Sequence, residues 1–167
     1  MRWRKYGRIA GESRLLGHLL RIGPYLPEQI SSQASELAST LKGPILSSAI
    51  LEFEMTFAIH AKESRGEIPT GSSGRVLSQF QTDIQSGRFL LVPLGSDIKS
   101  SAIEIASKIL LLAPPVFLRT LDGIHIATAL KLGSPELITA DKKMADSSTL
   151  LGLKTRLLKK PATVKNR

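Results

Sequence analysis

Residues 118–155 read LRTLDGIHIATALKLGSPELITADKKMADSSTLLGLKT. A helix is predicted over Leu121–Leu132, and Gly133 is well suited to end it because glycine adopts the left-handed conformation common at helix C-termini. A short apolar strand, Glu136–Ala140, follows, and a second helix is predicted over Asp141–Leu151. An apolar strand between two helices is typical of an α/β fold with a parallel sheet.

The rest of the chain continues this alternation of helices and short apolar strands. Helices are predicted over Glu28–Leu41, from Ser47 or Ser48 to Glu63, over Gly74–Gln85 with Gly87 as its stop, and after Ser96; strands are predicted over Ile45–Leu46, Arg88–Leu94 and Lys154–Leu158. We expect the hydroxyl groups of Ser47 or Ser48, Ser96 and Thr120 to cap the helices that follow them. This order predicts a parallel sheet with helices on both faces, joined by right-handed crossovers.

Composition predicts one soluble domain. The 167 residues are 42% hydrophobic, and the mean hydropathy is +0.04. No apolar run reaches the roughly 20 residues of a membrane helix, and no secretory signal is recognisable. The sequence has no cysteine, which excludes disulfides and thiolate metal sites and is compatible with a cytoplasmic protein.

The net charge of +9 is concentrated at the two ends. Residues 1–21 carry +5 and residues 154–167 carry +6, so the middle of the chain carries −2. Such ends would attract a polyanion, most plausibly RNA, because neutralised phosphates release counterions. The alternative is that the basic ends only keep the protein in solution.

Three acids are expected beyond predicted strand ends or in first helical turns: Glu54, Asp122 and Asp141. The reactive edge of a parallel sheet lies beyond the C-terminal strand ends. Carboxylates in such apolar surroundings need a compensating cation, and Mg²⁺ or Mn²⁺ prefers carboxylate oxygen. A metal-bound water could then attack a phosphodiester while the ion neutralises the charge that develops.

Each acid also has a simpler interpretation. Asp122 and Asp141 would be favoured by the helix dipole alone. Glu54 is predicted to lie close to an apolar stripe that contains Ala49, Phe53, Thr56, Phe57 and His60, whereas Glu52 is expected to be solvated. His125 lies one turn after Asp122, and a hydrogen-bonded core histidine is favoured over a role in phosphate binding or acid–base chemistry.

The quoted stretch closely resembles the C-terminal half of PIN domains of the VapC type. The shared features are Leu-Asp opening a helix, His-x-Ala-Thr-Ala-Leu within it, and Thr-Ala-Asp-Lys after a strand. Upstream, SSAILEFEMTFAI (47–59) resembles the segment that supplies the family's glutamate, here Glu54. The resemblance covers about Tyr25 to Leu153.

The resemblance implies a three-layer α/β/α fold with a mostly parallel sheet of four to five strands. It further implies a type II toxin that cleaves RNA with Mg²⁺ or Mn²⁺ held by Glu54, Asp122 and Asp141. A small antitoxin partner and a homodimer are implied as well.

The N-terminus departs from the family, whose first strand ends in a metal-binding aspartate, because no aspartate precedes Asp83. An ungapped alignment puts Gly17 at that position, whereas a gapped one makes Ile9–Gly11 the strand and Glu12 a tentative fourth ligand. A third explanation is a reading-frame slip or misplaced start before residue 23. We therefore divide the chain into an atypical basic segment (1–22), a PIN-like domain (23–153) and a basic tail (154–167).

Three functions follow from these patterns. The first is a metal-dependent endoribonuclease, and the second is a degenerate PIN module that binds RNA or a partner protein without cleavage. A basic DNA-binding protein is the third, although no helix-turn-helix or zinc motif supports it.

Overall fold

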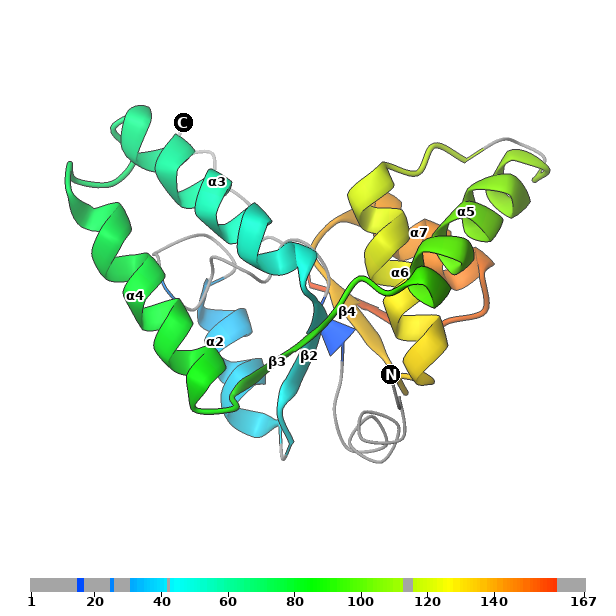
Figure 1. Ribbon diagram of the computed structural model, residues 1–167, viewed down its shortest axis with the longest axis horizontal. Coiled ribbons are helices and arrows are strands. Elements are labelled where there is room, and N and C mark those ends of the chain that lie inside the picture. Colours follow the sequence, from blue (N-terminus) through cyan, green and yellow to red (C-terminus); the bar gives the residue numbers. More distant parts are fainter. Residues whose placement is uncertain (1–14, 17–24, 26–30, 42, 113–115, 159–167) are drawn as a thin grey trace, which may run out of the picture.

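A five-stranded sheet crosses the centre of the protein (Figure 1). The structure is a computed structural model and describes residues 15–16, 25, 31–41, 43–112 and 116–158. The strands are β1 Leu15–Leu16, β2 Ile45–Ser48, β3 Phe89–Val92, β4 Leu137–Thr139 and β5 Thr155–Leu157. The helices are α2 Ser31–Thr40, α3 Ile50–Ser64, α4 Ser72–Gln85, α5 Ser96–Leu110, α6 Thr120–Leu132 and α7 Lys142–Leu150.

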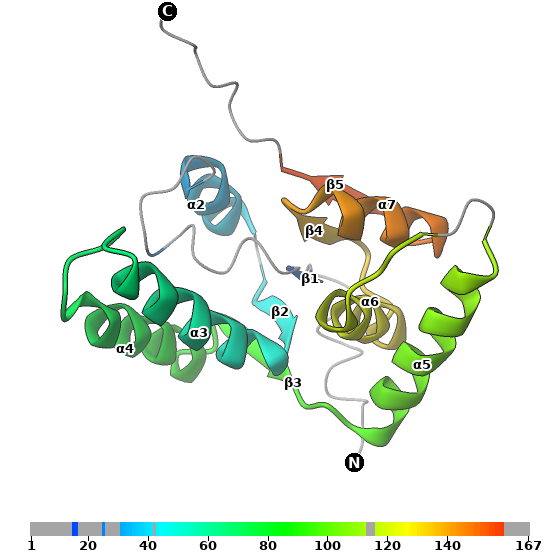
Figure 2. The ribbon, with the colours of Figure 1, turned by 90° about the horizontal axis from the view of Figure 1, so that it is seen from above.

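The strand order is β3-β2-β1-β4-β5, and all pairings between described strands are parallel. Helices α2, α3 and α4 lie on one side of the sheet, and α5, α6 and α7 lie on the other (Figures 1 and 2). This arrangement confirms the predicted three-layer α/β/α fold with a parallel sheet.

Each face of the sheet has its own hydrophobic core. In β2, Ile45 packs with the α2–α4 layer and Leu46 with the α5–α7 layer. In β4, Leu137 packs with the α5–α7 layer and Ile138 with the α2–α4 layer. Successive side chains of a strand point to opposite faces, so a strand covered on both faces needs neighbouring apolar residues, one for each core.

Strand β1 occupies the centre of the sheet although it lies in the atypical N-terminal segment. Leu15 pairs with Leu46 of β2 and with Leu137 of β4, and Leu16 pairs with Ile138. At least two residues of the 1–22 segment therefore belong to the sheet. The division of the chain at residue 22 remains a prediction, and the alternative strand at Ile9–Gly11 lies outside the described residues.

The predicted hydroxyl caps at Ser96 and Thr120 are wrong, whereas the Ser48 hydroxyl accepts a hydrogen bond from the backbone N–H of Ile50, the first residue of α3, at 3.4 Å. Ser47 and Ser48 lie inside β2, whereas Ser96 and Thr120 are the first residues of their helices. The residues at the N-cap positions of α3, α5 and α6 are Ala49, Gly95 and Arg119, and none makes a side-chain cap hydrogen bond. The sequence placed each helix start one or two residues too late or too early, which is the least determined feature of a periodic pattern.

The predicted apolar stripe of α3 is also wrong. Phe53 and Phe57 are 64% and 75% exposed, and His60 is exposed as well. The buried face of α3 instead carries Leu51, Glu54, Met55 and Ile59. Glu54 is therefore buried as expected, but together with Leu51, Met55 and Ile59 and not with the two phenylalanines.

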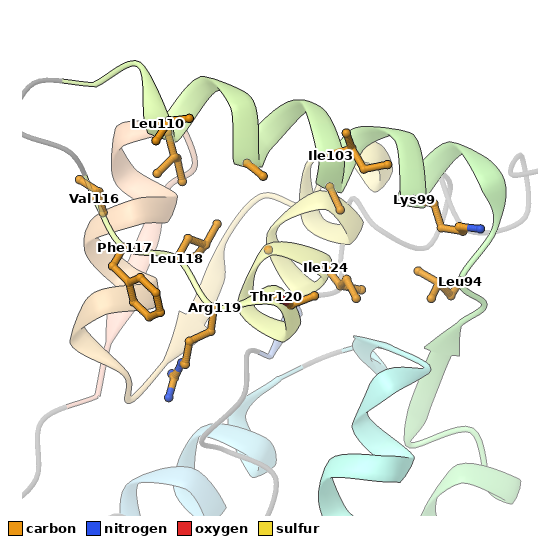
Figure 3. A pocket seen from close by; sticks show the side chains of 14 residues that line it. Leu94, Lys99, Ile103, Leu110, Val116, Phe117, Leu118, Arg119, Thr120 and Ile124 are labelled. Carbon is orange, nitrogen blue, oxygen red and sulfur yellow. The ribbon is translucent and has the colours of Figure 1, made fainter.

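A groove of about 520 Å³ lies between α5, α6 and residues 116–119 (Figure 3). Its lining is mostly apolar and includes Ile103, Leu110 and Phe117, which are largely exposed. Arg119 stands at the edge of this groove. Contiguous exposed apolar surface of this kind is uncommon on monomers and often marks a contact with another molecule.

No helix in the part of the chain that the structure describes is long and apolar enough to cross a membrane.

The double-sided core gives a stability prediction for β4. Leu137 is fully buried, whereas Leu157 on the neighbouring β5 is partly open to solvent. We expect Leu137→Ala to lower the free energy of unfolding by about 2–5 kcal/mol, because the substitution leaves a cavity between two layers. Leu157→Ala is the matched control and should cost less than about 1 kcal/mol. Urea denaturation measures both, and equal losses would contradict a core centred on β4.

Candidate functional site

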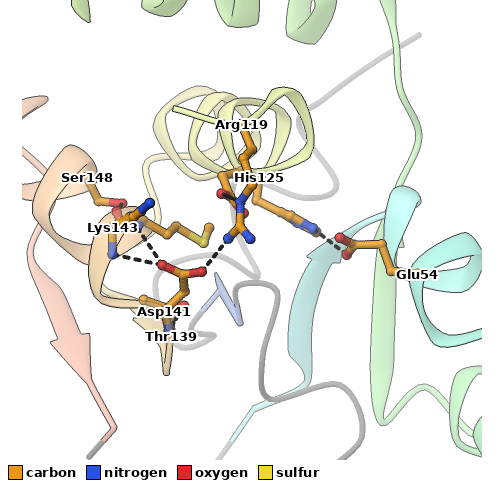
Figure 4. A network of polar contacts seen from close by, with 9 residues as sticks. Glu54, Arg119, His125, Thr139, Asp141, Lys143 and Ser148 are labelled. Atoms are coloured by element: carbon orange, nitrogen blue, oxygen red, sulfur yellow. Dashed lines mark hydrogen bonds and ion pairs between the residues drawn. The ribbon is translucent and has the colours of Figure 1, made fainter. Parts of the chain in front are cut away.

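The three predicted acids lie toward the C-terminal edge of the sheet. Glu54 is in the second turn of α3, which follows β2; Asp141 follows β4; and Asp122 is in the first turn of α6. Parallel strands all end at one edge, so residues far apart in the sequence come to this edge together (Figure 4). They form two neighbouring groups, one around Arg119 and one around His125.

Arg119 connects two of the carboxylates. Its Nε donates a hydrogen bond to Oδ2 of Asp122 at 2.7 Å, and its Nη2 donates to Oδ2 of Asp141. Arg119 directly precedes α6, so its guanidinium reaches back over the first turn of its own helix and across to the end of β4 (Figure 4). Both carboxylates raise the pKa of Arg119, and the hydrogen bond to Asp122 contributes most. The guanidinium therefore remains charged.

Asp141 has a second role as the N-cap of α7. Its Oδ1 accepts hydrogen bonds from the backbone N–H groups of Lys143 and Met144, at 2.8 and 3.2 Å. Burial raises the pKa of Asp141, but these amides and the charge of Arg119 outweigh burial and hold the pKa below its ordinary value. The carboxylate is thus ionised near neutral pH and fixed in place by the helix that it caps.

Asp122 has an unpaired buried oxygen. Its side chain is only 2% exposed, and Oδ1 has no hydrogen-bond partner among the described residues. Leaving a buried acceptor unsatisfied costs about 1–3 kcal/mol, and more when the group is charged. A hard divalent cation would satisfy this oxygen, since Mg²⁺ and Mn²⁺ bind carboxylates directly. The carboxylate oxygens of Asp122 and Asp141 are therefore of the kind that such an ion prefers, although no third His, Asp or Glu among the described residues completes the set.

Glu54 pairs with His125. The His125 Nε2 and the Glu54 Oε2 are 2.9 Å apart, and both side chains are buried. His125 lies one turn after Asp122 on α6, so this pair links α3 to the helix that carries Asp122. The histidine is a hydrogen-bonded core residue, as the sequence favoured, although its Nδ1 has no partner among the described residues.

The three acids do not all meet in one cluster. Among the described residues, no group of three or more His, Asp or Glu side chains is arranged to hold a metal ion. Asp122 and Asp141 share Arg119, whereas Glu54 faces His125 (Figure 4). That Glu54, Asp122 and Asp141 bind the same metal ion therefore remains a prediction. Glu12 and Gly17 lie outside the described residues.

Arg119 was missed by the sequence reasoning. The available signal was its position three residues before Asp122, a spacing at which side chains at a helix start can meet. Its contact with Asp141, 22 residues away, could not be read from any spacing.

Comparison with known proteins gives two positive findings. A family model for the PIN domain matches residues 24–148. A chain in the crystal structure of VapBC2 from Rickettsia felis, bound to a DNA fragment from their promoter, has a similar fold with a TM-score of 0.59. That chain is 14% identical, and the similarity covers 87% of the present chain and 98% of the other. No curated protein sequence matches.

Because Asp141 both caps α7 and carries a charge that faces Arg119, substitutions can separate these two contributions to stability. We expect Asp141→Ala to lower the free energy of unfolding by about 1–2 kcal/mol, because α7 loses its N-cap. Asp141→Asn should cost less, since the asparagine oxygen can still accept the two backbone hydrogen bonds while the charge facing Arg119 is lost. Urea denaturation compares the two variants, and equal costs would show that the cap contributes nothing.

Proposed function

We propose that this chain, which belongs to the PIN-domain family, is a divalent-metal-dependent endoribonuclease and the toxin of a type II toxin–antitoxin system. The observation that carries the proposal is the buried Oδ1 of Asp122, which has no partner among the described residues and lies beside the ionised Asp141 at the C-terminal edge of the sheet. Most buried acceptors are hydrogen-bonded, and a bound cation would supply the partner that this oxygen lacks among the described residues.

In this proposal Asp122, Asp141 and Glu54 hold Mg²⁺ or Mn²⁺, with Glu12 as a tentative fourth ligand. The bound ion would supply an ionised water and neutralise charge on the phosphodiester. The chain's own residues position the ligands: the amides of α7 fix Asp141, and His125 fixes Glu54. These contacts fix the orientation of two of the proposed ligand carboxylates independently of each other.

RNA is the proposed substrate because the charge of the chain suits a polyanion. The ends carry +5 and +6, whereas the segment that supplies the acids carries −2. Basic ends would hold the phosphate backbone while the acidic edge receives the cation. A cytoplasmic location agrees with this substrate and remains part of the proposal.

A small antitoxin protein is the proposed partner, and a homodimer is the proposed assembly. The structurally similar Rickettsia felis chain is from VapBC2, and its title describes a DNA-bound assembly. In the present chain, the groove with Ile103, Leu110 and Phe117 offers apolar surface for the antitoxin beside Arg119. Burial of such surface is the usual source of stability in protein complexes.

A degenerate module that binds RNA or a protein without cleavage is the second candidate. It is favoured by the position of β1, which ends at Leu16 and is followed in the sequence by Gly17. This register agrees with the ungapped alignment, in which a residue without a carboxylate stands at the family's aspartate position. Loss of one carboxylate from such a cluster would weaken cation binding.

Cleavage by purified protein tests the first candidate. We expect the full chain to cleave RNA with Mn²⁺ or Mg²⁺ and to lose activity in EDTA. Asp122→Asn should lower the cleavage rate by at least about 100-fold, because it removes a charged ligand of the ion. Asp146→Asn is the matched control, since Asp146 is an exposed acid on α7 that pairs with Lys142. The control should cleave within about twofold of the wild-type rate.

A thermal-shift titration accompanies the assay, because a cation that binds the folded state raises the melting temperature. We expect millimolar Mn²⁺ to stabilise the wild type and Asp146→Asn, but not Asp122→Asn. Tight RNA binding without cleavage in either ion would favour the degenerate module instead.

The missing aspartate can be tested by restoring it. If the ungapped register is right, Gly17→Asp should lower the half-saturating Mn²⁺ concentration by about tenfold, which corresponds to about 1.4 kcal/mol. Gly17→Asn controls for the size of the side chain and should have no such effect. Glu12→Gln should leave Mn²⁺ binding unchanged in this register, but it should weaken binding strongly if Glu12 is the substitute ligand. Calorimetric titration with Mn²⁺ measures all three variants.

A further inference from the structure

We propose that Arg119 is a built-in competitor of the divalent cation: its guanidinium occupies the Asp122–Asp141 pair in the metal-free protein, and a cation must displace it. This inference rests on the proposed function, because both concern the same carboxylates. It goes further by assigning a role to a residue outside the expected ligand set.

The first argument is how the oxygens of Asp141 are used. Oδ1 already accepts two backbone hydrogen bonds, from Lys143 and Met144. Those bonds fill the acceptor capacity of this oxygen and cap α7, so Oδ1 is a poor candidate for a further ligand. A cation that uses Asp141 must therefore bind Oδ2, which is the oxygen that Arg119 holds.

The second argument is the asymmetry of Asp122. Its Oδ2 accepts from Nε of Arg119 at 2.7 Å, whereas its buried Oδ1 has no partner among the described residues. One guanidinium thus satisfies one oxygen of each aspartate and leaves Asp122 incompletely paired. Arg119 therefore neutralises the two aspartates but does not satisfy Oδ1 of Asp122. A cation that bound this oxygen would make a contact that Arg119 does not make.

The third argument is charge. The guanidinium stays protonated under all ordinary conditions. It cannot leave the carboxylates by losing a proton. A divalent ion bound to Oδ2 of Asp141 and Oδ1 of Asp122 would meet strong repulsion from the guanidinium at close range. Occupation by Arg119 and occupation by the cation are therefore mutually exclusive.

The fourth argument is that the Arg119 side chain can move away from the two carboxylates. Its side chain is 46% exposed, and its backbone lies before the first residue of α6 in an extended conformation. The residue stands at the edge of the apolar groove (Figure 3), so the guanidinium can swing toward solvent without unwinding the helix. Displacement requires a rotamer change and no rearrangement of the sheet.

The consequence is that a higher cation concentration is needed to fill the site. Arg119 stabilises the metal-free fold by neutralising two carboxylates at the sheet edge. The same contact must be broken when Mn²⁺ or Mg²⁺ binds, so the cation concentration needed for half-saturation rises by the strength of that contact.

Titration of the full-length protein with Mn²⁺ alone, followed by the electron paramagnetic resonance signal of free Mn²⁺, tests the proposal. We expect Arg119→Gln to lower the half-saturating Mn²⁺ concentration by about tenfold, within the usual range of coupling between two binding events. The melting temperature of the metal-free variant should fall, and Mn²⁺ should raise it by more than it raises that of the wild type.

Arg156→Gln is the matched control for charge. Arg156 on β5 pairs with the buried Glu136 at 3.2 Å, so the substitution removes the same charge from a different carboxylate. This control should shift the half-saturating concentration by less than about twofold, as expected for a distant charge screened by salt.

The wild type provides a readout that does not depend on how well a variant folds. In nitrogen-15 nuclear magnetic resonance spectra, the side-chain Nε–H signal of Arg119 should move toward the position of a solvated arginine as Mg²⁺ is added. Arg119→Lys gives a second check, because lysine keeps the charge but lacks the planar fork that contacts both carboxylates. Its half-saturating concentration should lie between those of the wild type and Arg119→Gln.

The outcomes separate this inference from the proposed function. Equal Mn²⁺ binding by the wild type and Arg119→Gln, or weaker binding by the variant, overturns the inference and leaves the metal site standing. No Mn²⁺ binding by either protein overturns both. Binding by Arg119→Gln alone supports the inference and shows that the wild type behaves as the non-cleaving module. An Arg119 signal that is unchanged at Mg²⁺ saturation overturns the inference in the native protein.

Discussion

Burial of the parallel strands on both faces is the constraint on which the rest of this structure depends. Ile45 and Leu46 are neighbours in β2, yet each belongs to a different core, one shared with α2–α4 and the other with α5–α7. This arrangement requires a helix layer on each side and crossovers between parallel neighbours. It also brings every strand to an end at one edge, and that edge collects the acids of the candidate site.

At this edge, negatively charged carboxylates lie next to an apolar core and must be stabilised by nearby partners. The structure does so with two local pairings, Arg119 with Asp122 and Asp141, and His125 with Glu54. The His125–Glu54 pair links α6 to α3 and so joins the two helix layers, whereas Arg119 links the start of α6 to the start of α7 on one side of the sheet. The pairing around Asp122 is incomplete, since one buried oxygen stays unsatisfied among the described residues. The proposed cation would satisfy this oxygen, because hard divalent ions bind carboxylates directly.

The sequence was a good guide to the strands and helix stops but a poor guide to which helix face is buried. In α3, Phe53 and Phe57 form one apolar face, whereas Leu51, Met55 and Ile59 form another. Helical periodicity alone cannot choose between two such faces, because the choice depends on what the sheet and α4 present to the helix. The burial of Glu54 was predicted correctly, but for a reason that the structure does not support.

Local chemistry in the sequence by itself determined the alternation of apolar strands and helices, the stop at Gly133, the position of Asp141 at a helix start and the candidate acids. Tertiary structure alone decided that Leu15–Leu16 pairs at the centre of the sheet, that His125 meets Glu54, 71 residues away, and that Arg119 reaches Asp141. The reason is physical: propensities and caps act within a few residues, whereas strand pairing and ion pairing between distant segments form only when the whole sheet is assembled.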